Sequence, residues 1–249
     1  MNDISQSIGW AKWSWNALSG CLGPMGTPAS PRRCNYCYAR KLANGRLKPL
    51  YLANHNVLEG CMPLDPFAPR FWPERLAEPA KVKKPSGIFV GSMTELFHPA
   101  IPDEWREAVA NAEENAPWHT YIHLTKRPDN LPLEFGQAWI GITAEDQWYF
   151  EERWPHLALR QAAVRFVSME PLFGTLPRRV LEKYPPRPDW FILGGLTGRR
   201  QEWTDKGLRL LRGFILLLKE MEIPVFVKDS LEPHMRALGL PMLREFPDA

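Results

Sequence analysis

Three of the four cysteines lie close together near the N-terminus, at positions 21, 34 and 37, with the spacing C-x12-C-x2-C. A C-x2-C pair lets two thiolates reach one metal centre, and the third cysteine returns across a loop rich in proline and glycine. Three thiolates suit a 4Fe-4S cluster that keeps one iron open, whereas structural zinc normally takes four protein ligands. The pattern therefore predicts an iron–sulfur cluster held by Cys21, Cys34 and Cys37.

The same cysteines allow a second interpretation, a non-enzymatic module that binds zinc. In that case His55 or Cys61 would supply the fourth ligand. Neither residue has the tight paired spacing that zinc ligands usually show, and Cys61 alone is typical of a small buried apolar residue. We prefer the cluster, and the iron content of the protein distinguishes the two interpretations.

Composition narrows the class of protein. The net charge is +3 and the isoelectric point about 8.7, which permits an anionic partner without demanding one. Four cysteines in 249 residues do not make a secreted disulfide framework. The N-terminus is polar and no apolar run has the length of a membrane span, so we expect a cytoplasmic protein with no membrane partner.

From Gly87 onward, short apolar runs alternate with longer stretches of helix-forming composition. This alternation is typical of strands and helices that build a parallel sheet. An earlier strand is predicted around Trp13 and Trp15, where large apolar residues alternate with polar ones. The predicted later strands are 88–92, 120–125, 138–143, 164–169, 190–194 and 225–228, and the predicted helices are 103–115, 145–163 and 204–222.

Seven candidate strands without a glycine-rich dinucleotide fingerprint favour a barrel over a flat sheet. We therefore expect an α/β fold, a partial TIM-like parallel β/α barrel formed by residues 1–249 as a single domain. The cysteine loop, 21–37, would follow the first strand. Residues 38–60 have helical composition, and the prolines of residues 61–87 predict an irregular connection.

Polar or small residues follow most of the predicted strands. In α/β barrels the C-terminal ends of the strands build the ligand site, so these residues predict a polar pocket at one mouth. The alternative is that they are ordinary loop starts and helix caps, as Thr143 and Ser168 could be. The candidates are Gly91, Ser92, Met93, Glu95, His98, Lys126, Arg127, Thr143, Glu145, Glu170 and Lys228.

Six blocks in order resemble the phage-associated three-cysteine-motif family of the radical S-adenosylmethionine (SAM) superfamily. This chain departs from the family pattern at two points. Its first cysteine gap is long, whereas the commonest spacing in the superfamily is C-x3-C-x2-C. Leu196 follows Gly-Gly, a position at which an acidic residue is common. The blocks are Trp15-Asn16, 89–98, 124–128, 139–142, 164–172 and 190–195.

The resemblance implies that a 4Fe-4S cluster and SAM are the cofactors, with the cluster on Cys21, Cys34 and Cys37. The cofactor carries the chemistry, a reductive cleavage of SAM to a 5′-deoxyadenosyl radical, and the protein positions it. An external electron donor such as flavodoxin or ferredoxin is implied as well. By analogy, the SAM-binding residues are Tyr36, Gly91, Ser92, Met93, Lys126, Arg127, Thr143 and Glu145, and the substrate-side residues are Glu95, His98, Glu170 and Lys228.

The resemblance also suggests a substrate and the cytoplasm of a phage host as the location. We expect a modified base in DNA, such as a hypermodified thymine, and a rearrangement that would make the protein an isomerase. The base would have to leave the duplex or be single-stranded to reach a buried radical. Basic pairs at Arg32-Arg33 and Arg199-Arg200 are compatible with phosphate contacts. RNA, a peptide or a base lesion remain alternative substrates.

Overall fold

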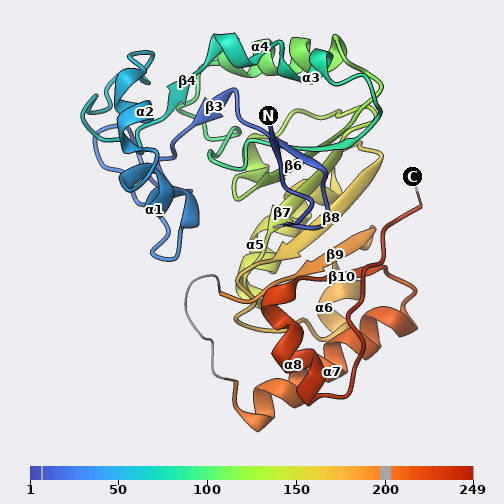
Figure 1. Cartoon of the computed structure of the whole chain (residues 1–249). Helices are drawn as coiled ribbons and strands as arrows, with labels where there is room; N and C mark the ends of the chain where they lie inside the picture. Colours follow the sequence, from blue (N-terminus) through green and yellow to red (C-terminus); the bar gives the residue numbers. More distant parts are fainter. Residues whose placement is uncertain (7, 197–202, 249) are drawn as a thin grey trace. The chain divides into compact units, whose positions relative to one another are not determined.

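The computed structural model describes residues 1–6, 8–196 and 203–248. The chain divides into two compact units, Met1–Asn130 and Leu131–Ala249. The fold is α/β, and its eight-stranded main sheet has the order β1-β2-β5-β6-β7-β8-β9-β10 (Figure 1). The described neighbouring strands are parallel except β1 and β2, which confirms the predicted partial TIM-like barrel. That the whole chain acts as a single domain stays a prediction.

The first unit supplies β1 (Asn2–Asp3), β2 (Trp13–Trp15), β5 (Gly87–Val90) and β6 (Thr120–Thr125). The side chains of β5 after its first residue are all buried. Such an unbroken apolar run is typical of a parallel strand that is covered on both faces. The strand β1 was not predicted from the sequence, because two polar exposed residues show no periodicity.

A second, small sheet in this unit pairs β3 (Leu18–Ser19) with β4 (Arg70–Phe71). Residues 61–87 are otherwise irregular, as expected, apart from the short helices η1 (Pro73–Arg75) and α3 (Glu78–Lys81). The longer helix α4 (Asp103–Glu114) lies between β5 and β6 and agrees closely with its predicted range. The one-turn helix η2 (Pro128–Asn130) follows β6.

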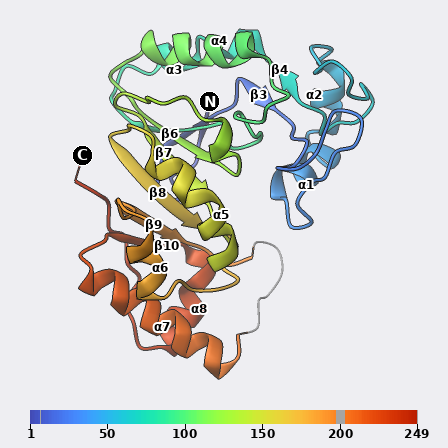
Figure 2. The same ribbon diagram turned by 180° about the vertical axis from the view of Figure 1, so that it is seen from behind.

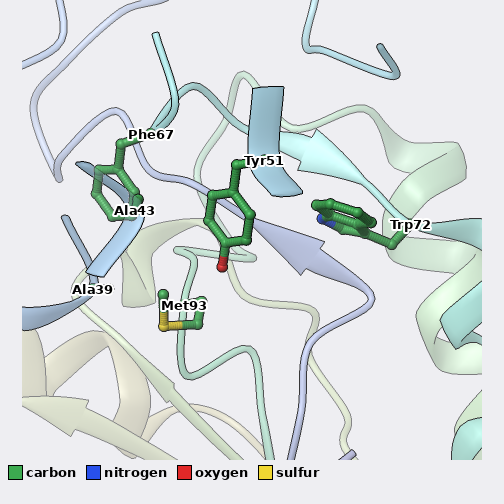
Figure 3. Packing of buried hydrophobic residues seen from close by; sticks show 6 residues of the cluster. All are labelled: Ala39, Ala43, Tyr51, Phe67, Trp72 and Met93. Carbon is green, nitrogen blue, oxygen red and sulfur yellow. The ribbon is translucent and has the colours of Figure 1, made fainter. Parts of the chain in front are cut away.

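The segment 38–60 forms two short helices, α1 (Tyr38–Asn44) and α2 (Lys48–Ala53). They separate at Gly45, whose N–H caps the carbonyls of Lys41 and Leu42. The buried faces of both helices enter one cluster with residues from three other segments (Figure 3). The members are Ala39, Ala43, Tyr51, Phe67, Trp72 and Met93, and the cysteines Cys21 and Cys37 pack against them.

The second unit supplies four parallel strands, β7 (Trp139–Thr143), β8 (Val164–Met169), β9 (Trp190–Leu193) and β10 (Val225–Val227) (Figure 2). Its helices are α5 (Gln147–Ala158), α6 (Arg178–Lys183), α7 (Asp205–Glu220), η3 (Asp229–Leu231) and α8 (Glu232–Ala237). Helix α7 buries one apolar face, which includes Leu211, Ile215 and Leu218. The short helices α6 and α8 were not predicted.

Candidate functional site

The cysteine loop begins where β3 ends. Gly20 has a φ of +83°, and a Cβ there would stand 2.2 Å from the Ala68 carbonyl oxygen, so only glycine fits. The next residue, Cys21, donates its N–H to the Phe67 carbonyl at 3.1 Å. At the other end of the loop, Cys37 is the N-cap of α1 and donates its N–H to the Cys34 carbonyl at 3.2 Å. Secondary structure thus fixes the backbone at both ends of the motif.

The three thiols influence one another electrostatically. The pKa of the Cys21 thiol is raised to about 12, chiefly by burial and also by the charges of Glu95, Cys37 and Cys34. Burial also raises the pKa of Cys37, with Cys34 adding to the effect. Backbone amides oppose the increase, since the Gly23 N–H donates to Cys21 Sγ at 3.1 Å and the Arg40 N–H to Cys37 Sγ at 3.4 Å. Without metal, Cys21 and Cys37 stay protonated at neutral pH, and metal binding would release their protons.

The donor set of the cysteine loop consists of thiols. All four cysteines are free thiols. Within the described parts of the chain, no three His, Cys, Asp or Glu side chains converge on a point that could hold one metal ion. Structural zinc normally takes four protein ligands, whereas in a 4Fe-4S cluster each thiolate binds a different iron. The three thiols and their N–H···S bonds therefore fit the predicted cluster.

The zinc interpretation requires His55 or Cys61 as the fourth ligand. His55 is exposed. Burial raises the pKa of Cys61, and its charged neighbours are Arg33, Asp65 and Arg70. Cys61 is only partly buried, whereas we had expected a buried residue.

The long first gap of the motif is tied to the rest of the unit by side chains that bind its carbonyl oxygens. His98 Nε2 lies 3.1 Å from the Gly26 carbonyl oxygen, and His98 Nδ1 accepts the Ala100 N–H at 3.1 Å. Because Nδ1 accepts, Nε2 carries the proton and donates. Burial lowers the pKa of His98, with Arg127 adding to the effect, so the ring stays neutral. His98 thus holds the insert, and a role on substrate stays a prediction.

Two arginines add further ties. Arg127 Nη1 donates to the Pro24 carbonyl at 2.6 Å, while its other nitrogens bind the Asp129 carboxylate at 2.9 and 2.7 Å. Arg33 Nε donates to the Cys21 carbonyl at 2.7 Å, and its Nη2 binds Asp65. Both guanidinium groups bind partners inside the unit, and their expected contacts to SAM and to phosphate stay predictions.

Lys126, Tyr36 and Glu95 meet beside the cysteine loop. Lys126 Nζ lies 2.7 Å from the Tyr36 hydroxyl oxygen and 4.9 Å from the centre of its ring. The Lys126 N–H donates to one oxygen of Glu95 at 2.8 Å, and the Thr125 hydroxyl donates to the other at 2.5 Å. Burial raises the pKa of Glu95, while these hydrogen bonds oppose the increase. The structure thus brings three of the predicted residues together.

Asn16 is a site residue that the sequence reasoning missed. Its Oδ1 accepts the Met93 N–H at 2.9 Å, and its Nδ2 donates to Ser92 Oγ at 3.1 Å. Gly91 precedes this pair with a φ of +73°, which turns the backbone toward Asn16. The sequence carries a signal for this position, because Asn16 directly follows the strand β2.

The remaining predicted residues lie in the second unit. Lys228 and Glu170 form an ion pair beside Gly194, where a Cβ would stand 3.0 Å from Glu170 Cγ and 3.1 Å from Lys228 Cδ. Glu145 is buried and pairs with Arg153 at 3.1 Å, and the Thr143 carbonyl accepts from the same arginine at 2.7 Å. That Thr143 and Glu145 bind SAM stays a prediction.

The expectation that both sets of residues share one mouth also stays a prediction. The structure describes Ser92 and Lys126 in the first unit, and Thr143, Glu170 and Lys228 in the second. The predicted phosphate contacts at positions 199 and 200 lie outside the described residues.

The fold and the cysteine loop define an α/β protein with a partial parallel barrel and a candidate metal centre. The chain belongs to the family described as "Protein of unknown function (DUF5131)", whose model matches residues 5–212. Neither the curated proteins nor the solved structures contain a match to it. Within the described residues, no helix is long and apolar enough to cross a bilayer.

Proposed function

We propose that this protein is a radical SAM enzyme whose 4Fe-4S cluster is held by Cys21, Cys34 and Cys37. The observation that carries the proposal is that Cys21 and Cys37 pack against one buried cluster, on a three-cysteine loop whose backbone is fixed at both ends. Backbone N–H groups already point at two of the sulfurs, and such hydrogen bonds stabilise thiolates once the metal has displaced the protons.

When bound, the reduced cluster supplies the electron that cleaves SAM to methionine and a 5′-deoxyadenosyl radical. The side chains of this unit orient SAM. Lys126 is our candidate for its carboxylate, because an ammonium group gives a charge-assisted hydrogen bond and Tyr36 holds Nζ beside the loop. Arg127 is the weaker candidate, since Asp129 and Pro24 already occupy its guanidinium.

The backbone after β5 is proposed to receive the amino group of SAM. Asn16 accepts the Met93 N–H and contacts Ser92, so the turn from Gly91 to Met93 has one fixed conformation. Tyr38 donates to the Ser92 carbonyl at 2.5 Å and ties the same turn to α1. This fixed turn beside the cysteine loop is the support for the assignment.

The Glu170–Lys228 pair is proposed to act on the substrate side. Both side chains are largely buried, and Gly194 leaves the space in which they meet. A carboxylate and an ammonium group in contact can pass a proton between them and a bound molecule. Glu95 is a less suited candidate, because Thr125 and Lys126 already donate to both of its oxygens.

For the substrate we propose a modified base in DNA, such as a hypermodified thymine, with rearrangement by an isomerase mechanism. The support is the resemblance of the ordered blocks and the exposed Arg32 in the cysteine loop. Such a base would have to be flipped out or single-stranded. RNA, a peptide and a base lesion are the alternatives, and cytoplasmic location is part of the same proposal.

Anaerobic purification tests the cluster and the SAM chemistry. We expect a brown protein with about equal amounts of iron and acid-labile sulfide, which cleaves SAM to 5′-deoxyadenosine and methionine after reduction. A colourless protein with one equivalent of zinc would instead establish the zinc-binding module. Mass spectrometry of DNA nucleosides from cells with and without the gene tests the substrate. An unchanged nucleoside profile would exclude DNA as the substrate.

A further inference from the structure

The first unit carries an unbalanced positive surface next to the cysteine loop. Between Asp3 and Glu59 the sequence contains no acidic residue. Five basic side chains are exposed between the cysteine loop and the start of α2. They are Arg32, Arg40, Lys41, Arg46 and Lys48, which we call the basic surface. No ion pair involving them is found among the described residues.

Exposed aliphatic side chains accompany these cations. Met25 in the cysteine loop is 70% exposed, and Met62 and Leu64 are 73% and 81% exposed. The loop that carries Met62 and Leu64 lies against the cysteine loop, because a Cβ at Gly60 would be 3.2 Å from Pro28 Cβ. The ion pair between Arg33 and Asp65 joins the same two loops. Cations and exposed aliphatic groups therefore occupy adjoining segments.

We propose that the basic surface, with Met25, Met62 and Leu64, docks an acidic protein that carries electrons to the cluster. The proposal rests on the proposed function. Arginine and methionine with exposed apolar groups are typical of protein–protein interfaces, whereas surfaces for single-stranded nucleic acid rely on aromatic stacking. Tyr38 is the exposed aromatic residue of α1, and its hydroxyl is already bound to Ser92.

The position of the surface suits this partner. Cys37 caps α1, so the cations of α1 begin within one turn of a predicted cluster ligand. Electron transfer requires the carrier to approach the cluster closely, and complementary charge raises the rate of productive encounters. The reduced flavin or iron–sulfur centre of the carrier loses one electron and the cluster gains it. No bond forms or breaks in this step.

The test combines binding with cluster reduction. The triple variant Lys41→Glu/Arg46→Glu/Lys48→Glu reverses the charge of the surface without touching a predicted ligand. The control Lys206→Glu/Arg209→Glu/Arg212→Glu makes the same change at exposed positions of α7. The probe is a reduced acidic flavodoxin, whose binding is followed by calorimetry and whose oxidation is followed by stopped-flow absorbance.

For the surface variant we expect flavodoxin binding and cluster reduction to weaken on the order of tenfold or more at low salt. The control variant should behave as the wild type, and dithionite should reduce both variants equally. Equal losses in both variants, or no loss in either, would overturn the proposal. Weakened binding of a DNA oligonucleotide with unchanged flavodoxin binding would overturn it too and assign the surface to nucleic acid. The proposed function is tested separately by the iron and sulfide content of the wild-type protein. A wild-type protein without iron and sulfide would contradict that function.

Discussion

His98 donates from Nε2 to the carbonyl oxygen of Gly26, across 3.1 Å and 72 residues of sequence. This bond joins the loop after β5 to the insert that lengthens the first gap of the cysteine motif. The insert is therefore held in place by the unit on which it lies, and its conformation does not depend on the cluster alone.

We expect His98→Ala to release the insert and to speed the loss of iron from the loaded protein to a chelator. The variant should also lose about 1–3 kcal/mol of unfolding free energy, because the Gly26 carbonyl stays buried without its donor. His98→Gln, which keeps an N–H donor, should recover part of the iron retention.

His119→Ala is the matched control for this experiment. His119 is equally buried in the same unit and binds the carbonyls of Pro79 and Val82 at 3.1 and 3.0 Å, away from the insert. It should lower stability without changing iron release. Equal iron release from both alanine variants would show that His98 has no specific effect on the cluster.

The cysteine assignments give a second prediction. Cys21→Ala, Cys34→Ala and Cys37→Ala should each abolish the visible absorbance of the cluster and the cleavage of SAM, because each removes one of three ligands. Cys61→Ala should retain the absorbance and the cleavage of SAM, because Cys61 lies outside the three-cysteine motif. Its charged neighbours are Arg33, Asp65 and Arg70. Loss of the cluster in Cys61→Ala would show that the ligand set is wrong.

Gly194→Ala should disturb the Glu170–Lys228 pair. The new Cβ would stand 3.0 Å from Glu170 Cγ and 3.1 Å from Lys228 Cδ, so at least one side chain has to move. We expect denaturant titration to show a lower stability. Gly213→Ala is the control, because a Cβ there meets nothing within 4 Å and alanine in a helix stabilises by about 0.5–1 kcal/mol. A stability of Gly194→Ala equal to that of the wild type would contradict the packing.

Glu95 predicts a pH dependence of stability in the apoprotein. Burial raises its pKa in the folded state above the ordinary carboxyl value of 4.5. Between these two pKa values the folded state keeps a proton that the unfolded state has lost, so the stability falls as pH rises. Relative to Glu95→Gln, the unfolding free energy should fall by up to about 1.4 kcal/mol per pH unit in this window. If the unfolding free energies of the wild type and Glu95→Gln changed in parallel with pH, the raised pKa of Glu95 would be contradicted.

Much of the fold was predictable from the sequence for a physical reason. Strands such as β5 and β9 are buried on both faces, so they appear as unbroken apolar runs between polar segments. The cysteine motif was equally visible, because its ligands are close in sequence. The strands β3 and β4 were not predicted. Each has only two residues, which is too short to show an alternation of apolar and polar side chains, and the paired residues lie some fifty positions apart in the sequence.

The tertiary structure decided what the candidate side chains bind. Three candidate side chains, His98, Arg127 and Arg33, bind the carbonyls of Gly26, Pro24 and Cys21, respectively. A backbone carbonyl is present at every residue, so no sequence pattern shows which one a distant side chain will reach. The sequence by itself determined the seven strands of the main sheet other than β1, and the three-cysteine motif. Only the fold determined that the long insert between the first two cysteines is tied down by side chains from elsewhere in its unit.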